Sequence, residues 1–414
     1  MKSAFIRIGR YGLKIILSAL SLVGVLYLLA FTPFGNTLLK PLVEKKLHSM
    51  FQTPVNIDTF ILTHDTLHLH FHDTLTNNMD IQGKFSLITL NLHSFYQANL
   101  SKLGGLNALD FPLKTSGALN GSYGMMMAQG SATIFDGSLQ YRAKFNHFDL
   151  SDLHLSLSSL NYQSLMQWLD YPHNSSTMLA GEIDLHGLDR RDVEGTATLQ
   201  TRTQTFFPSP IVDDNTSFDF LSLFTDDHGM IQPFRLNLSL NASVDELGIL
   251  EQFAMLPLRG NADLKAILQG DQDRLVLDAR TNLAKSSTYA RVHWKRLRPS
   301  YVYLNMDHAD ANALFHIFSL PSPIEGNIHL NAESDITNTT AKLSITHGIT
   351  HPDIFKQEYA LTQPLIHFTT LISLEATPKV IHYRGNFSSD LARLNIDDTT
   401  THESMLRDLL KAIP

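Results

Sequence analysis

Residues 235–241 read Arg235-Leu236-Asn237-Leu238-Ser239-Leu240-Asn241, a strict alternation of polar and apolar side chains. Successive side chains of a β-strand point to opposite faces of the sheet, so this period of two predicts a strand with one apolar and one polar face. The stretch decides the fold class. We expect a β-protein in which one face of the sheet must be kept from water.

The same alternation recurs elsewhere in the chain, in residues 67–72, 301–306 and 327–331. Between these runs lie dipeptides typical of turns, at Asn120-Gly121, Asp136-Gly137 and His347-Gly348. We expect the apolar members of the strands to line one shared face. The residues expected there are Leu67, Leu69, Phe71, Leu236, Leu238, Leu240, Val302, Leu304 and Met306.

Two stretches of the chain share one layout. The matching pairs 145 residues apart are Pro112 and Pro257, Leu119 and Leu264, and Gly181 and Gly326, while Pro172 and Pro321 are 149 apart. Before each of the last two prolines, residues 162–169 and 311–318 show helical spacing of apolar side chains. A repeat made mostly of strands indicates an elongated, stacked sheet rather than a compact enzyme core.

The N-terminus has the features of a membrane anchor. Residues 15–31 contain no charge, and Gly12 and Leu13 with a snorkelling Lys14 extend the run enough to span a bilayer. The basic residues before it predict a cytoplasmic N-terminus and a translocated body. A cleaved signal peptide is the alternative, but Leu28-Leu29-Ala30 supplies only one of the two small residues that cleavage needs.

Two further helices are expected. Residues 36–51 place leucines at helical spacing, and this helix would lie on the membrane surface or cap the first strand of the sheet; we favour the cap because an exposed edge needs a cover. At the other end, Thr400 and Glu403 form a capping box. The helix that follows would dock on the sheet, on a partner or on the membrane. Its apolar stripe comprises Met405, Leu406, Leu409, Leu410 and Ile413.

These observations predict a mainly β fold. An N-terminal transmembrane helix is followed by an elongated, curved antiparallel β-sheet groove with short helices and a C-terminal amphipathic helix. The expected segments of the 414 residues are a cytoplasmic basic segment 1–12, the anchor 13–31, an amphipathic helix 32–51, N-terminal strands 52–107, a β repeat 108–205, a linker and strand 206–252, a second β repeat 253–350, C-terminal strands 351–400 and a C-terminal helix 401–414.

Composition excludes several classes of function. The chain has no cysteine, which rules out disulfides and thiolate chemistry. Its net charge is −8, and −12 without the four basic residues of the first 14, which disfavours nucleic-acid binding. No nucleophile elbow, phosphate-binding loop or metalloprotease helix is present, so we expect no catalytic residue and no cofactor.

A histidine cluster is the one candidate metal site in the sequence. His64, His68, His70 and His72 lie close to Asp65 and Asp73, and histidines two apart on a strand share a face that could chelate zinc or nickel. The alternative is that they form the polar face opposite Leu67, Leu69 and Phe71. We favour the polar face and expect no metal, because no set of three or four converging ligands is specified.

The chain resembles the AsmA-like superfamily of Gram-negative envelope proteins, which includes the TamB- and YhdP-type proteins. The resemblance rests on the basic N-terminus with its single anchor, the exit Thr32-Pro33-Phe34-Gly35, and repeated strands such as Phe148-Asp149-Leu150 and Gly181-Glu182-Ile183. It implies an inner-membrane protein with a cytoplasmic N-terminus and a periplasmic body. In that family a β-groove carries phospholipid towards the outer membrane or supports outer-membrane lipid homeostasis.

We therefore expect a non-catalytic protein that binds phospholipid acyl chains and is anchored in the membrane. The alternative is a periplasmic scaffold that assists outer-membrane protein assembly through its edge strands or its C-terminal helix, with an envelope protein as partner. An envelope hydrolase is the least supported function, since no catalytic motif is present.

Overall fold

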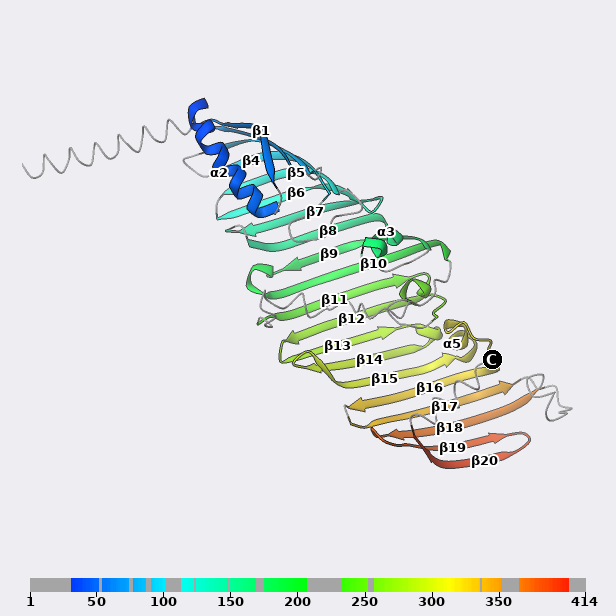
Figure 1. The fold of residues 1–414 in the computed structure, drawn as a ribbon. Helices are drawn as coiled ribbons and strands as arrows, with labels where there is room; N and C mark the ends of the chain where they lie inside the picture. The colour runs from blue at the N-terminus through cyan, green and yellow to red at the C-terminus, as the bar shows by residue number, and fades with distance from the viewer. Residues whose placement is uncertain are drawn as a thin grey trace, which may run out of the picture. The chain divides into compact units, whose positions relative to one another are not determined.

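A computed structural model describes residues 31–51, 54–73, 77–86, 91–101, 113–122, 124–147, 149–168, 175–206, 233–251, 257–335, 337–350 and 365–401. The described chain is mainly β, as the sequence predicts, and contains twenty strands. It divides into two compact units, Met1–Leu155 and Ser156–Pro414. In Figure 1 the strands of each unit lie side by side in chain order.

Unit 1 is a ladder of antiparallel strands that follow one another in sequence and pair with their neighbours. Its strands are β1 (Val55–Leu62), β2 (Thr66–Asp73), β3 (Asn78–Ser86), β4 (Asn91–Leu100), β5 (Leu113–Ser122), β6 (Met125–Ile134) and β7 (Gly137–Asn146), and the division between the units falls inside β8 (Asp149–Asn161).

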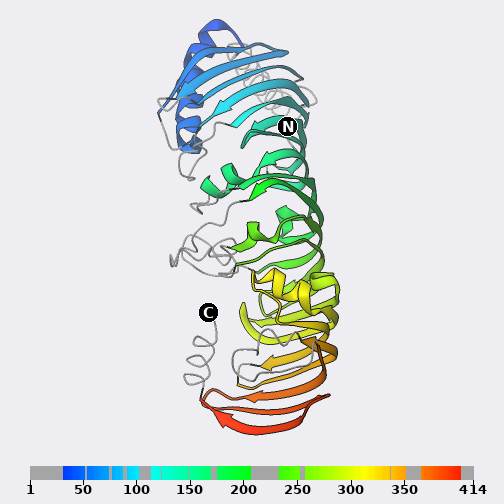
Figure 2. The ribbon, with the colours of Figure 1, turned by 90° about the vertical axis from the view of Figure 1, so that its right-hand side faces the viewer.

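Helix α2 (Pro33–Phe51) covers the first strand of unit 1 (Figure 2). Val43 and Leu47 of the helix pack on the apolar cluster formed by Val55, Ile57 and the β2 residues Leu69 and Phe71. The helix also protects the outer edge of β1. Glu44 Oε1 accepts a hydrogen bond from the Ile57 amide (3.2 Å), and Asn36 Oδ1 accepts one from the Leu62 amide (3.3 Å). The expected capping helix is therefore confirmed, and the strand edge is closed by side chains.

Replacing Val43 by Asp should lower the melting temperature of the protein and promote aggregation, because a charge would then lie against the buried cluster under α2. Leu42→Asp is the matched control, since the neighbouring Leu42 is exposed. Thermal unfolding with light scattering measures both effects. Equal melting temperatures for the two variants would show that α2 does not cap the sheet.

In the middle of unit 1, two glycines make room for two tyrosine rings. Gly117 and Gly130 pair across β5 and β6, and they are flanked in register by Tyr96 and Tyr141 on β4 and β7. A side chain at Gly117 or Gly130 would meet the Oη of Tyr96 or Tyr141 at 2.8 Å. The two hydroxyl groups bond to each other across the glycines. Burial, together with this bond, raises the pKa of Tyr96.

Unit 2 continues the same strand pattern over the C-terminal part of the chain, and Figure 2 shows its last strands (orange to red) bowing rather than lying flat. Its further strands are β9 (Ser175–His186), β10 (Asp192–Phe206), β11 (Arg235–Val244), β12 (Ala262–Asp271), β13 (Arg274–Thr281), β14 (Ser287–Lys295), β15 (Arg298–Asp310), β16 (Ile324–Asp335), β17 (Thr339–Thr350), β18 (Ile366–Ala376), β19 (Ile381–Ser389) and β20 (Arg393–Thr400).

The expectation of a wholly antiparallel sheet is wrong at one place. Strands β10 and β11 pair in parallel, with Asp192 opposite Arg235 and Ala197 opposite Leu240. Parallel neighbours need a connection of at least about a dozen residues to bring the chain back to the same end of the sheet, and residues 207–234 exceed that length. The alternation of leucines in β11 is the same in either direction, so it could not reveal this pairing.

Two of the predicted turns are also wrong. Asn120-Gly121 lies inside β5, where Gly121 has φ +141° and leaves room for the backbone at Met125. His347-Gly348 lies inside β17, at a bulge where the pairing with β18 shifts register. A side chain at Gly348 would meet the Phe368 ring at 2.7 Å. Both glycines therefore serve close packing within the sheet rather than reversal of the chain.

Short helices close one side of unit 2 where the repeat predicts them. They are α3 (Tyr162–Trp168) and α5 (Ala311–Ile317), capped by Asn161 and Asp310, whose side chains accept hydrogen bonds from the amides of Ser164 and Ala313. Helix α3 packs on the 3₁₀ turn η3 (Leu247–Leu250) through Tyr162, Met166 and Ile249. The Tyr162 hydroxyl donates a hydrogen bond of 2.9 Å to the Ile249 carbonyl.

Burial raises the pKa of Tyr162 to about 12, which predicts a loss of stability in alkali. The unfolded chain would ionise Tyr162 near pH 10 while the folded chain would not. The stabilisation is thus complete below pH 10 and falls by about 1.4 kcal/mol per pH unit up to pH 12. Tyr162→Phe should be less stable than the wild type at neutral pH. The gap between the two should narrow over that window, as followed by denaturant unfolding at each pH; a constant gap would contradict the prediction.

Some expectations fall on residues that the structure does not describe. The anchor at 13–31 lies outside the described residues apart from Phe31, and so does the C-terminal helix apart from Thr401. Within the described segments, no helix has the length and apolar character to cross a bilayer.

Candidate functional site

The apolar face of unit 2 contains an unbroken row of cross-strand partners. We call it the central row. From β9 to β18 each residue stands opposite the next, and all ten are apolar. The members, in strand order, are Ile183, Ala197, Leu240, Ala266, Ala279, Ala290, Leu304, Ala332, Ala341 and Leu374. Six of them are alanines, whose side chains are single methyl groups, so most of the row forms a shallow surface close to the backbone.

Larger side chains stand on both sides of the central row. On one side, β11 to β15 place Leu238, Leu268, Leu277, Val292 and Val302 in register. On the other side, Met306, Leu330, Leu343 and Ile372 continue across β15 to β18. Partners on neighbouring strands share a face of the sheet. Larger apolar side chains therefore flank the central row on one side from β11 to β15 and on the other side from β15 to β18, and the two strips overlap only at β15.

The two margins of this face are packed, while its middle is only half-buried. At one margin α5 and η4 (Leu283–Lys285) contribute Ala311, Ile317 and Ala284 to a core that also contains Met306 and Ile328. At the other margin Phe234, Leu236 and Leu275 are buried, with Trp294 and Leu297 packed on them. Between the margins, Leu238, Leu240 and Leu304 are half-buried. The face thus has filled sides and an accessible middle.

The structure brings six of the nine predicted residues together on this face. Leu236 and Met306 belong to the packed margins, Leu238, Leu240 and Leu304 to the half-buried middle, and Val302 is 40% exposed. Sequence reasoning missed the alanines of the central row. Alternation in residues 262–268 and 274–281 was the available signal, but alanine contributes too little hydrophobicity to mark a face by itself.

The other three predicted residues lie in unit 1. Leu69 and Phe71 are buried, Phe71 to 1% exposure, and Leu67 packs on the same cluster beneath α2. The prediction that they share a face is confirmed, since they stand opposite Gly83, Ile81 and Met79 of β3. Their role differs from the expected one, because α2 covers them and they form core rather than open surface.

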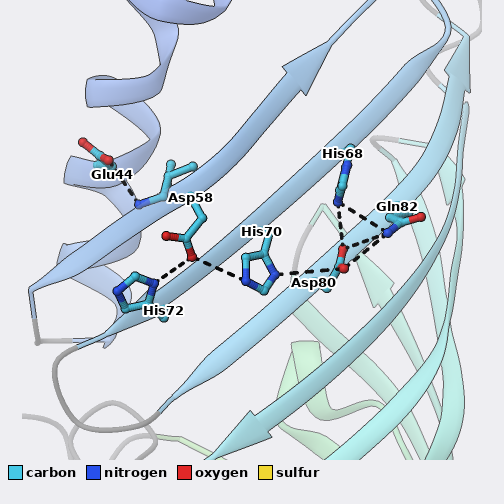
Figure 3. A network of polar contacts seen from close by, with 8 residues as sticks. Glu44, Asp58, His68, His70, His72, Asp80 and Gln82 are labelled. Carbon is cyan, nitrogen blue, oxygen red and sulfur yellow. Dashed lines mark hydrogen bonds and ion pairs between the residues drawn. The ribbon is translucent and has the colours of Figure 1, made fainter.

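The histidine cluster forms a chain of alternating imidazoles and carboxylates on the opposite face of unit 1 (Figure 3). Asp58 on β1 lies 2.7 Å from His72 and 3.4 Å from His70, while Asp80 on β3 lies 3.3 Å from His68. The predicted acidic neighbours are not the partners: Asp65 contacts His64, and Asp73 is buried against Asn77. The sequence could not show Asp58 and Asp80, because only the strand register brings them there.

Each carboxylate stands between two imidazole rings, so the arrangement is a ladder of polar contacts across β1, β2 and β3 on an accessible face (Figure 3). The same face of unit 1 has a shallow hollow of about 650 Å³ over β4 to β7, lined by polar side chains such as Gln97, Gln129 and Arg142 and also by Phe95, which is 74% exposed. The lining is therefore mixed, whereas the buried apolar cluster beneath α2 lies on the other face of the sheet.

The polar face of unit 2 is held by its own network. Asp278 receives a hydrogen bond of 2.6 Å from Arg291 Nε, and this bond lowers the pKa of the carboxyl group. The same carboxylate accepts a bond from the Tyr289 hydroxyl, and Arg280 and Arg291 lie near the Tyr289 ring. These residues stabilise strand pairing and hold no nucleophile next to a base.

Comparison with known proteins gives no relative for this chain: no family model, no curated protein and no solved structure matches it.

Proposed function

We propose that this chain binds lipid acyl chains along the central row of unit 2 and thereby supports phospholipid transport or outer-membrane lipid homeostasis. The observation that carries the proposal is the unbroken apolar register over ten strands with filled margins and a half-buried middle. The resemblance to the AsmA-like superfamily adds the location: the inner membrane, crossed once, with the body in the periplasm.

The dimensions of the row suit hydrocarbon. Strands lie about 4.8 Å apart, so ten strands extend over ~43 Å. One leaflet of a bilayer is about 15 Å of hydrocarbon, half of the ~30 Å core. The row could therefore hold a chain at any of several positions along its length. Each CH₂ group removed from water contributes about 0.8 kcal/mol, and no single residue must supply the affinity. An even, low-specificity surface is suited to a chain that moves along it.

Helix α2 supports contact with a membrane surface. Its sheet-facing residues include Val43 and Leu47, but Phe34, Leu38 and Leu42 form a stripe on another side with exposed fractions of 59% to 64%. These residues are four apart and so share a helix face. The expected anchor ends just before this helix. The two interpretations of the helix are thus compatible, since one side caps β1 and another side would face lipid headgroups and acyl chains.

The full-length protein, purified in detergent and extracted with organic solvent, should release phospholipid detectable by mass spectrometry. Leu240→Asp should reduce the lipid recovered per protein several-fold, because a carboxylate in the central row would need to be desolvated by the bound chain. Asn241→Asp is the matched control. Asn241 is the next residue of β11, points to the exposed polar face and stands opposite Lys265.

A second variant distinguishes loss of lipid binding from a folding defect. Ala290→Phe would raise the floor of the central row without a charge, and it should lower lipid recovery while leaving the melting temperature within a few degrees of the wild type. Wild-type lipid recovery from folded Leu240→Asp and Ala290→Phe proteins would contradict the proposal, and so would a wild-type protein that is folded and lipid-free.

A scaffold that engages an envelope protein is the second candidate, and β20 is the observation that favours it. This last strand pairs with β19, and its Leu394 and Ile396 are 53% and 42% exposed. An exposed apolar edge strand is suited to strand addition by a partner. The variants above separate the two functions, because a scaffold would keep its activity in cells when the central row is blocked.

A further inference from the structure

A β-bulge in unit 2 places two residues of β15 opposite one residue of β16. Met306 pairs with Leu330 and Ala309 pairs with Ile328, so Asp307 and His308 both stand opposite His329. His308 has φ +55°, a left-handed conformation that costs energy for a residue with a side chain. The bulge breaks the strict alternation of the strand and brings two neighbouring polar side chains towards the same partner.

The three side chains converge on one point. Oδ1 of Asp307 lies 2.7 Å from Nδ1 of His329 and 2.9 Å from Nδ1 of His308. The two imidazole rings meet edge to face with their centroids 4.3 Å apart. The ligand atoms of all three residues lie within 4.8 Å of one another. Among the residues that the structure describes, this trio is where three such groups gather closely enough to share an ion.

The repeat shows which part of this arrangement belongs to the fold. Ser159, 149 residues before His308, has φ +56° and stands at the same place before α3 as His308 does before α5. Asn161 and Asp310, also 149 apart, both cap the helix that follows. The strained backbone is thus a feature of both repeats. The first repeat has Ser158 and Ser159 at these positions, so the paired Asp and His are particular to the second.

We propose that Asp307, His308 and His329 bind a divalent transition-metal ion of the zinc class. Two imidazoles and one carboxylate form a ligand set that Zn²⁺ accepts, with the fourth position left to water. Tetrahedral ligands at about 2.0 Å from zinc are about 3.3 Å apart. The two imidazole nitrogens would each move about half an ångström away from Asp307 Oδ1, and all three donor atoms already lie within 4.8 Å of one another. The ion would join β15 to β16 at the bulge, where the ladder of backbone hydrogen bonds is interrupted.

The donor atoms at the site suit a cation. Oδ1 of Asp307 and the Nδ1 atoms of His308 and His329 already face one another, so a carboxylate oxygen and two imidazole nitrogens are in place for an ion. The histidine ladder of unit 1 differs in the way that matters, because no three of its described residues bring their ligand atoms within 4.8 Å of one another. The ladder therefore serves as a control for zinc binding, because it has more histidines than the Asp307 trio but no point at which three ligand atoms converge.

Titration calorimetry of the full chain in detergent, with Zn²⁺ as the probe, tests the site. The wild type should bind one equivalent that Mg²⁺ does not compete for, and Asp307→Ser/His308→Ser should weaken that binding at least tenfold. Serine is the residue that the first repeat has at both positions, so this variant keeps a bulge that the fold accepts. His329→Asn should weaken binding similarly. Triple replacement of His68, His70 and His72 by Asn should leave the equivalent in place.

Zn²⁺ should also raise the melting temperature of the wild type by several degrees, since an ion that binds only the folded state stabilises it. This rise should be absent in the Ser/Ser variant and present in the triple Asn variant. Undiminished zinc binding by folded Ser/Ser and His329→Asn proteins would overturn the proposal. Loss of the equivalent in the triple Asn variant alone would overturn it too, and would assign the metal to the ladder of unit 1.

Discussion

Strand register is the constraint on which the rest of the structure depends. Side chains alternate between faces, so a shift of one residue in any pairing would move a whole strand of apolar side chains to the wet face. In unit 2 the register is kept from Ile183 to Leu374 through nine successive pairings. The central row, the filled margins and the convergence of Asp307, His308 and His329 all follow from it.

The sequence predicts what is local and misses what depends on pairing. Alternation in residues 235–241 was enough to place Leu236, Leu238 and Leu240 on one face, and helical spacing before Pro172 and Pro321 was enough to place α3 and α5. Neither signal contains the partner strand. For that reason Asp58 and Asp80 were not identified beside the histidines, and the parallel pairing of β10 with β11 was not foreseen.

The dipeptides Asn120-Gly121 and His347-Gly348 predict turns that the structure does not contain, and the reason lies in glycine itself. A glycine permits a reversal of the chain, but it also permits another side chain to lie over the backbone. At Gly348 the neighbour is the Phe368 ring, and at Gly117 it is the hydroxyl of Tyr96. Sequence alone does not separate these uses, because both need the absence of a Cβ. In a sheet with few covering helices, rings lying over glycines supply packing that a second layer would otherwise provide.

The parallel pair has a consequence for the order in which the chain assembles. The other pairings of the described strands join antiparallel neighbours along the chain, most of them through short connections, so each hairpin can form as soon as it is synthesised, with little loop entropy to overcome. Strands β10 and β11 can pair only after residues 207–234, which separate them in the chain, have been synthesised. Strand pairing in unit 2 is therefore expected to be delayed at the β10–β11 junction. Each side of it can settle its own register before the two are joined, and an insertion in the connecting segment would leave both registers intact.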